Sequence, residues 1–298
     1  MKASIIGAGR LGTCLGRALA AHGIAIQAVC DRTAGRAALG RRYLGAGLAT
    51  TDHALAASLA EVVFLCLPDD AIAGEARNLA GAGLRWRRKT VFHCSGLLAA
   101  DKLSPLRRRG AAVASFHPVQ SFPRKGMPPS VFRGITVGLE GERSARLLGR
   151  KIALRLGAQP MTVRASDKSL YHAACSLASN HALVLFRMAA RLLSDTGMSL
   201  RKAEQVLLPL AQGTLQNVKE LGSAAALTGP LVRGDAATVA RHLQALKKRS
   251  GLLRAYRTLA IEGLAMARRS GLPPPSITAL SRLLKTPRKK TTKIGGAR

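Results

Sequence analysis

A glycine-rich turn near the amino terminus constrains the fold more than any other feature of the chain. Gly7, Gly9 and Gly12 stand at GxGxxG spacing within SIIGAGRLGTCLGRAL (residues 4–19). An apolar stretch precedes the glycines, apolar residues at helical spacing follow them, and a second apolar stretch ends at Asp31. This succession of strand, glycine turn, helix, strand and acid is the context in which such spacing binds a dinucleotide. A glycine turn without a ligand is the less favoured alternative.

Each position of this turn has a physical role. Gly7 permits the tight turn, Gly9 lets the backbone approach a pyrophosphate, and Gly12 lets the helix pack closely on the strand. The free N–H groups at the start of the helix then face the phosphates. The residues expected to contact the cofactor here are Gly7, Gly9, Arg10, Leu11 and Gly12.

The two residues at the end of the second strand bear on which nucleotide binds, and each favours a different one. Asp31 is placed to accept a hydrogen bond from the ribose 2′-OH of NAD, whereas Arg32 is placed to clamp the 2′-phosphate of NADP. Arg36 and Arg10 could reinforce a positive pocket. The balance favours NADP and leaves NAD possible.

The alternation of strands and helices continues to about residue 164. Apolar stretches predict strands within residues 60–67, 89–94, 110–122, 134–141 and 159–163, with a helix over 142–157. Ligands bind at the carboxyl ends of the strands in such sheets. The residues expected to flank a nicotinamide there are Leu67, Pro68, Ser95 and Gly96, with Ser95 and His117 also facing a substrate.

From residue 165 the strand signals give way to long helical patterns, over residues 165–197, 199–222 and 235–271. The fold class is therefore an α/β Rossmann-type domain over residues 1–164 followed by an all-α domain over 165–284. The end of the chain, residues 285–298, has almost no apolar residues and is expected to be a disordered basic tail.

A polar stripe follows one face of the first long helix. Lys168, His172, Ser176 and Asn180 recur at steps of four on an otherwise apolar pattern, with Ser179 beside them. If the stripe faces a cleft, Lys168 or His172 could donate a proton to a carbonyl or imine, and Asn180 could orient the substrate or the nicotinamide amide. The alternative is a solvent-facing stripe with Lys168 exposed. The cost of burying polar groups without partners favours the cleft.

Lysine and arginine outnumber acidic residues by 47 to 15, giving a formal net charge of +32. Nucleic acid is one partner that such a charge can attract. Aromatic residues make up only 3%, so stacking platforms are scarce, and no nucleic-acid-binding motif is present. We expect a solvated basic surface that contacts nucleic acid only non-specifically.

Five widely spaced cysteines without a CxxC or Cys/His cluster predict reduced thiols and no metal site. No stretch approaches the roughly 20 apolar residues that cross a bilayer. A first strand starts almost at the initiator methionine, which leaves no room for a signal peptide. The expected location is the cytoplasm.

Five motifs occur in an order that is more specific than any one of them: GAGRLG, FHCSG, FHPVQSF, DKSLYHAACSLASN and LTGPLVRGD. Over residues 2–284 the chain resembles a family that joins a Rossmann-like NADP-binding domain to a helical C-terminal domain of unknown function. That family belongs to the 6-phosphogluconate dehydrogenase-like group, with pyrroline-5-carboxylate reductase and ketopantoate reductase as relatives. The resemblance implies NAD(P)-dependent reduction and a homodimer built through the helical domain, which also serves the substrate. It implies no particular substrate.

The chain departs from the hydroxyacid members of that group, which carry a catalytic Lys and an Asn one helical turn apart. Here His172 is four residues after Lys168, and Asn180 is twelve after it. Since an imidazole titrates near neutral pH, the proton donor stays open among Lys168, His172 and His117.

The segment LTGPLVRGD (residues 227–235) admits two interpretations. Arg233 could hold a substrate carboxylate across the dimer. Alternatively, the segment is a loop between helices that ends with Asp235 as the N-cap of the next helix.

Together these features predict an NADP-dependent oxidoreductase that reduces a C=O or C=N bond in a small anionic substrate. One alternative is a redox-sensing or scaffold protein that binds NADP(H) without turnover. A less favoured alternative is a basic nucleic-acid-binding protein on a Rossmann scaffold.

Overall fold

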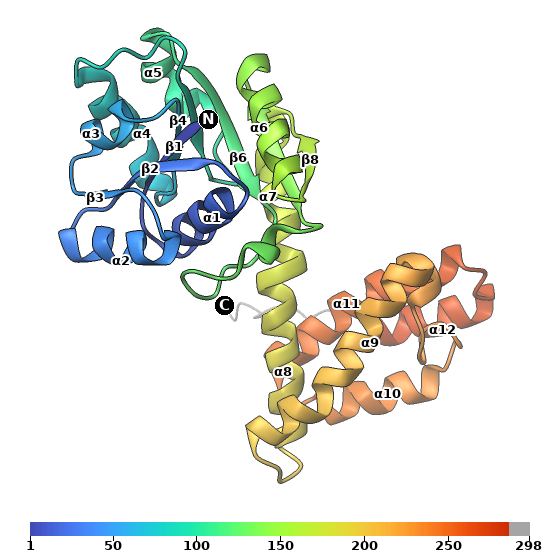
Figure 1. Ribbon diagram of the computed structural model, residues 1–298. Coiled ribbons are helices and arrows are strands. Elements are labelled where there is room, and N and C mark those ends of the chain that lie inside the picture. Colours follow the sequence, from blue (N-terminus) through green and yellow to red (C-terminus); the bar gives the residue numbers. More distant parts are fainter. Residues whose placement is uncertain (286–298) are drawn as a thin grey trace, which may run out of the picture. The chain divides into compact units, whose positions relative to one another are not determined.

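The computed structural model describes residues 1–285, so that nearly all of the expected basic tail lies outside the described residues (Figure 1). Contacts within the chain define two compact units, Met1–His181 and the residues from Ala182 onward. The expected domain boundary between residues 164 and 165 stays a prediction. No helix among residues 1–285 is long and apolar enough to cross a membrane.

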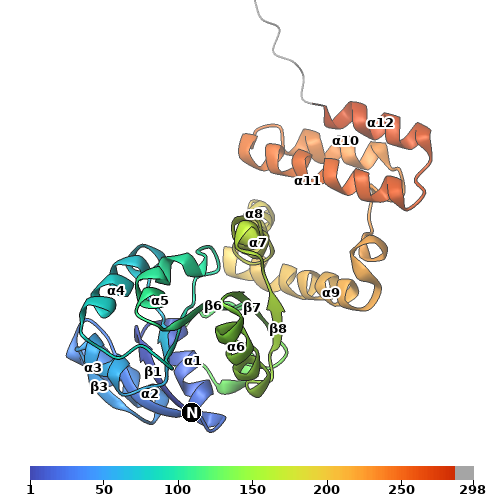
Figure 2. The same ribbon diagram turned by 90° about the horizontal axis from the view of Figure 1, so that it is seen from above.

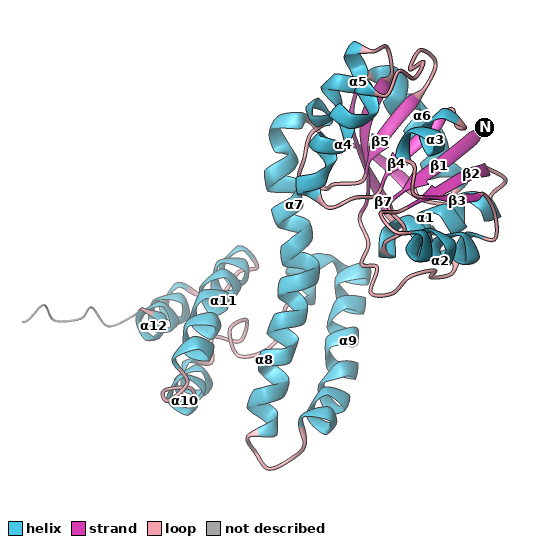
Figure 3. Cartoon of the chain, turned by 90° about the vertical axis from the view of Figure 1, so that its left-hand side faces the viewer, coloured by secondary structure: helices cyan, strands magenta, loops and turns pink. Residues whose placement is uncertain are grey.

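The first unit is built on one eight-stranded sheet with the order β3-β2-β1-β4-β5-β6-β7-β8 (Figure 3). The strands are β1 (Lys2–Ile6), β2 (Ala25–Cys30), β3 (Leu48–Thr50), β4 (Val62–Leu65), β5 (Thr90–His93), β6 (Ala112–Pro118), β7 (Thr136–Gly141) and β8 (Gln159–Thr162). All neighbours are parallel except β6 and β7. The predicted strands are confirmed, and β3 is a strand that the pattern did not indicate.

Alternating side chains give the sheet two apolar faces. Ile5 and Phe64 belong to one core cluster, whereas the next residues, Ile6 and Leu65, belong to the other. The first face packs against α1 (Arg10–Ala21), α2 (Ala34–Leu44) and α6 (Arg143–Arg155), and the second against α3 (His53–Ser58), α4 (Asp69–Gly81) and α5 (Ser104–Arg108). Figure 2 shows helices on both sides of this sheet.

The strand order reverses at β1, which has β2 on one side and β4 on the other. Connections from β1 and β4 therefore leave toward opposite faces, and a crevice opens beyond the carboxyl ends of these strands. This crevice is where the residues expected to bind a cofactor lie.

The long helical pattern of residues 165–197 contains more than one element. A 3-10 turn (Ala165–Asp167) leads into α7 (Lys168–Ser176), followed by a π-helical turn over Leu177–His181. These elements close the first unit.

The second unit is entirely helical among its described residues, which confirms the predicted fold class. It comprises α8 (Ala182–Ser194), α9 (Leu200–Ala226), α10 (Ala236–Ala245), α11 (Ser250–Arg269) and α12 (Pro274–Leu284). Helix α8 packs along α9, while α10, α11 and α12 share an apolar core around Val239, Leu264 and Leu280.

Candidate functional site

The glycine turn between β1 and α1 has the geometry that its spacing predicts. Gly7 adopts a φ of 107°, which favours glycine, and its N–H donates to the Cys30 carbonyl at 2.8 Å. A Cβ on Gly12 would overlap the Gly7 carbonyl, so the helix reaches the strand only because no side chain is present. A Cβ on Gly9, in contrast, would meet no atom within 4 Å. The space above Gly9 is open to a ligand.

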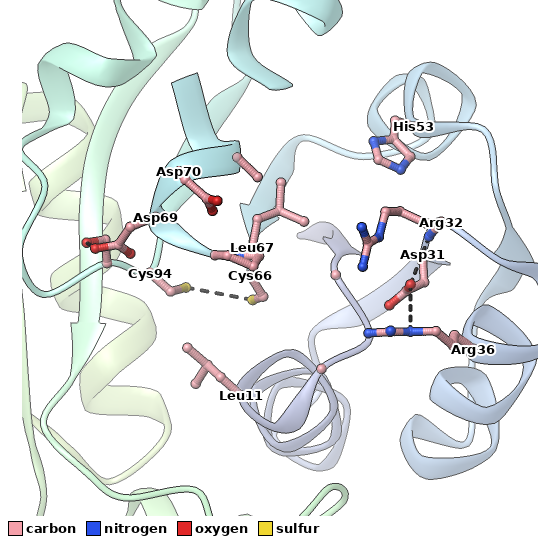
Figure 4. Close-up of a pocket in the computed structure, with 15 residues that line it drawn as sticks. Leu11, Asp31, Arg32, Arg36, His53, Cys66, Leu67, Asp69, Asp70 and Cys94 are labelled. Atoms are coloured by element: carbon pink, nitrogen blue, oxygen red, sulfur yellow. Dashed lines mark hydrogen bonds and ion pairs between the residues drawn. The ribbon is translucent and has the colours of Figure 1, made fainter. Parts of the chain in front are cut away.

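A pocket of about 510 Å³ lies at this turn (Figure 4). Its lining includes eight residues expected to hold a cofactor: Gly7, Gly9, Leu11, Asp31, Arg32, Leu67, Pro68 and Ser95. Three others that were expected there do not line it. Arg10 is exposed at the start of α1, Gly12 lies beneath the turn, and Gly96 is buried against His117 and His172.

Asp31 stabilises the glycine turn through hydrogen bonds. Its carboxylate is 5% exposed and accepts hydrogen bonds from the N–H of Ala8 at 2.9 Å and of Arg32 at 2.8 Å. The Nε of Arg36 pairs with the same carboxylate at 2.9 Å. The Arg32 guanidinium extends into the pocket beside them and forms no ion pair with any residue of 1–285 (Figure 4). One Asp31 oxygen therefore has two polar partners and the other has one, whereas the Arg32 charge is available to an anion.

A third cation at this end of the pocket comes from His53, which no motif of the sequence indicates. Hydrogen bonds with Cys30 and with Glu75 raise the pKa of His53 to about 10. Its Nδ1 lies 2.7 Å from the Glu75 carboxylate. The imidazole is therefore protonated at neutral pH, and it faces the pocket together with Arg32 and Arg36. Nothing in the spacing of the sequence marks this residue.

A second pocket, of about 400 Å³, lies at the end of β6 and along α7. It brings together three residues predicted to be catalytic, His117, His172 and Asn180. The remaining lining residues are Val119, Gln120, Ser121, Cys175, Ser176, Ala178 and Ser179. None of these lining residues is a lysine or an arginine, whereas the first pocket is lined both by the cations Arg32, Arg36 and His53 and by the carboxylates Asp31, Asp69 and Asp70.

Gly96 separates the two pockets. Its neighbour Ser95 lines the first, and a Cβ on Gly96 would lie 2.8 Å from the Nε2 of His117 and 2.7 Å from the Cδ2 of His172. Both imidazoles therefore pack against the Gly96 backbone. A side chain at this position would displace them.

His117 is held by Tyr171, a residue that the sequence analysis did not identify. The Tyr171 hydroxyl and the Nδ1 of His117 are 2.7 Å apart, and the two rings meet edge to face. Burial, followed by the charge of Lys168, lowers the pKa of His117 to about 4. His117 is therefore a neutral imidazole at physiological pH.

Lys168 lines neither pocket and is only 2% exposed. Its Nζ donates to the Ser115 hydroxyl at 2.9 Å and to the Ser95 carbonyl at 3.2 Å. Burial keeps the pKa of Lys168 below its usual value. The solvent-facing alternative is therefore wrong for Lys168, although Asn180, on the same stripe, is exposed.

The loop that carries Ser95 is fixed by further polar contacts. The Ser95 Oγ donates to Asp69 at 2.8 Å, and the Ser95 N–H donates to the Nδ1 of His93 at 3.2 Å. The other ring nitrogen of His93 then carries the proton, which it donates to the Ala99 carbonyl at 3.2 Å. This arrangement holds the loop between the pockets in one conformation.

The remaining substrate candidate, Arg233, belongs to the helical unit and is exposed. The cap predicted next to it is confirmed, because Asp235 accepts a hydrogen bond from the N–H of Thr238 at 2.9 Å. The role of Arg233 toward a substrate stays a prediction. Residues 1–285 contain no group of three or more His, Cys, Asp or Glu side chains that could hold a metal ion.

Comparisons by family cover both parts of the chain. Residues 1–118 match the Rossmann-like domain, and residues 135–262 match a domain of unknown function, DUF2520. The chain combines a Rossmann-like domain with a DUF2520 domain. This confirms the resemblance inferred from the five motifs. A comparison with curated proteins by sequence finds no match.

Similar solved structures share the architecture. A Bacteroides fragilis protein described as a "putative NADP oxidoreductase" has 25% identity and a TM-score of 0.72, covering 89% of this chain and 98% of that chain. A Thermotoga maritima protein has 26% identity and a TM-score of 0.71, covering 90% and 99%. The fold is also that of Plasmodium falciparum pyrroline carboxylate reductase with NADP bound, at 12% identity and a TM-score of 0.60, covering 90% and 98%.

Proposed function

We propose that this protein is an NADP-dependent oxidoreductase that reduces a C=O or C=N bond of a small substrate. The observation that carries the proposal is the pairing of two adjoining pockets across Gly96. One has an open glycine turn with Arg32, Arg36 and His53 near Asp31, and with Asp69 and Asp70 elsewhere in its lining. The other has two imidazoles. The description of the similar Bacteroides fragilis structure as a "putative NADP oxidoreductase" supports the same function.

The first pocket fits a dinucleotide phosphate. The open space above Gly9 would take the pyrophosphate, close to the N–H groups at the start of α1. Arg32, Arg36 and His53 would meet the 2′-phosphate of NADP with positive charge. Asp31 would serve NAD less well, because it is only 5% exposed and already has three polar partners.

NADPH, when bound, supplies the hydride for the reduction. In the second pocket His117 would donate a hydrogen bond to the carbonyl oxygen or imine nitrogen of the substrate as a neutral imidazole, and His172 beside it would supply a proton. Lys168 would position the Ser95 carbonyl, which lies between the two pockets, by donating a hydrogen bond to it. Asn180 would orient the substrate from the π-helical turn.

The substrate is small because its pocket is about 400 Å³. An anionic substrate remains part of the proposal, with Arg233 of a second copy as the residue that would meet its carboxylate across the dimer. Since no lysine or arginine lines the pocket, the part of the substrate that enters it would be uncharged. Paired ketoacids and their amides, and cyclic imines with and without a carboxylate, would show which part of the proposal holds.

A parallel fluorescence titration with NADPH and NADH tests the cofactor. Arg32→Ala should weaken NADPH binding by about 1.5–3 kcal/mol, roughly ten- to a hundredfold, and leave NADH binding nearly unchanged. Arg201→Ala, which removes an exposed arginine of α9, is the matched control. If neither nucleotide binds the wild-type protein, the proposed function is wrong. Binding without hydride transfer to any substrate class would favour the redox-sensing or scaffold alternative.

We also propose that two copies of the chain pair through their helical units. Large apolar side chains of α8 and α9 are exposed, namely Leu183, Val184, Leu185, Val206, Leu208, Leu210, Leu215, Val218 and Leu221. Monomeric proteins rarely expose so many such side chains on two neighbouring helices. Light scattering coupled to gel filtration should give twice the mass of the chain. A monomer at micromolar concentration would contradict the pairing.

A further inference from the structure

Two cysteines lie side by side in the cofactor pocket and have no part in the proposed reduction. Cys66 directly follows β4 and Cys94 directly follows β5. The last paired residues of these strands are Leu65 and His93, and the N–H of Cys94 donates to the Leu65 carbonyl at 3.3 Å. The two cysteines thus occupy the next opposite positions of neighbouring parallel strands. Their sulfur atoms are 3.7 Å apart (Figure 4).

This placement meets the geometric demands of a disulfide. Neighbouring strands run about 4.8 Å apart, and disulfides join Cα atoms separated by about 4.4–6.8 Å. The two side chains already point toward each other, so closing the remaining gap requires side-chain rotation rather than rearrangement of the sheet. No other two of the five cysteines have sulfur atoms in contact.

The pocket gives a small oxidant access to the pair. Both cysteines line it, Cys66 being half-buried and Cys94 only 7% exposed. The hydrogen bond with Cys66, together with burial, raises the pKa of the Cys94 thiol. Cys66 is therefore the residue that meets an oxidant first, and Cys94 is positioned to react with the oxidised Cys66.

We propose that Cys66 and Cys94 form a modification site at which a peroxide creates a disulfide inside the cofactor pocket. The Cys66 sulfur attacks one oxygen of hydrogen peroxide, which breaks the O–O bond and gives a sulfenic acid, and the other oxygen leaves with the thiol proton as water. The Cys94 sulfur then displaces the hydroxyl of that sulfenic acid as a second water and forms the S–S bond. Two electrons pass from the thiols to the peroxide, and a dithiol restores both thiols.

The position of Cys66 couples this chemistry to the nucleotide. A Cβ on Gly12 would lie 3.1 Å from the Cys66 Cβ, and a Cβ on Gly7 would overlap the Cys66 carbonyl, so Cys66 packs directly under the glycine turn. Leu67 and Ser95, the next residues after the two cysteines, also line the pocket. Formation of the disulfide draws Cys66 toward Cys94 and so changes the packing under the glycine turn. Oxidation therefore weakens NADPH binding. That consequence rests on the proposed function, whereas formation of the disulfide does not.

The first experiment treats the full-length protein with hydrogen peroxide, counts thiols after denaturation and maps peptides by mass. Free thiols should fall from five to three, with a linked peptide joining Cys66 to Cys94 that dithiothreitol releases. Cys66→Ser and Cys94→Ser should abolish the link, whereas Cys175→Ser should keep it. Retention of five thiols, or a link between other cysteines, overturns the proposal.

The second experiment compares NADPH binding by the reduced and oxidised proteins. We expect at least a tenfold weaker affinity after oxidation, restored by dithiothreitol and absent in Cys94→Ser. Saturating NADPH should in turn slow formation of the linked peptide, because coupling between two sites is reciprocal. Equal affinity of both forms overturns the coupling. If the reduced protein does not bind NADPH, the proposed function is wrong. The modification site is then tested only by the linked peptide of the first experiment.

Discussion

The ammonium group of Lys168 lies 2.9 Å from the hydroxyl of Ser115, and the residue is buried and lines neither of the two pockets. Its charge is one of the causes that keep the pKa of His117 near 4, after burial. Lys168 therefore acts on the imidazole without touching the space in which a substrate would sit.

Replacing Lys168 by methionine should raise the pKa of His117. The sign follows from charge, because removing a nearby cation makes the imidazolium less unfavourable. Burial remains, so the pKa should stay below the ordinary value of about 6.5. A titration of the His117 resonances by NMR measures this shift. Lys151→Met, at an exposed position of α6, is the control, and an unchanged pKa in Lys168→Met would mean that the two groups do not interact.

Alanine at Gly9 and at Gly12 should have opposite effects on stability and binding. Gly9→Ala enters open space at a φ of −75°, so the unfolding free energy should change by less than about 0.5 kcal/mol. NADPH affinity should nevertheless fall at least tenfold, since the new methyl group occupies the space proposed for the pyrophosphate. Gly12→Ala forces α1 away from the Gly7 carbonyl and should cost roughly 1–3 kcal/mol of stability. Chemical denaturation and NADPH titration of both variants separate the two roles, and unchanged affinity in Gly9→Ala would contradict the proposed binding mode.

The features that local sequence determines were predictable. The glycine turn, the strands β4 to β8 and the cap at Asp235 each depend on a few consecutive residues whose conformational preferences agree. The segment that became α2, β3 and α3 gave no such signal. Its strand has three residues, and its helices are rich in alanine and glycine, which carry little periodicity.

The features that depend on distant contacts were not predictable. Gly96 faces two histidines from β6 and α7, and His53 owes its raised pKa to Cys30 and Glu75, which lie on β2 and α4. The stripe from Lys168 to Asn180 correctly indicated one helix face, but it could not show that Lys168 is buried while Asn180 is exposed. Only the packing of α7 against the sheet decides that difference.

Alanine substitutions of Asp235 and Arg233 should distinguish a structural role of one residue from a functional role of the other. Asp235 accepts hydrogen bonds from both the N–H and the hydroxyl of Thr238, so Asp235→Ala should lower the melting temperature by removing the cap of α10. Arg233→Ala should leave the melting temperature unchanged, because the Arg233 side chain is exposed. If Arg233 meets a substrate carboxylate, its removal should raise KM for carboxylate substrates and not for their amides. Equal effects on both substrate classes would remove Arg233 from substrate binding.

Buried His93 should make the fold sensitive to mild acid. Burial lowers the pKa of His93 to about 4, whereas in the unfolded chain it is near 6.5. The unfolded state therefore binds a proton at a pH where the folded state does not, so the contribution of His93 to stability is complete above pH 6.5 and is lost as the pH falls toward 4. The difference between the two pKa values corresponds to about 3 kcal/mol of stability.

His93→Gln keeps an acceptor for the Ser95 N–H and a donor for the Ala99 carbonyl but cannot titrate. Urea unfolding between pH 7 and pH 4 should show a shallower loss in His93→Gln, and identical pH profiles would mean that folded His93 binds its proton as readily as the unfolded chain does.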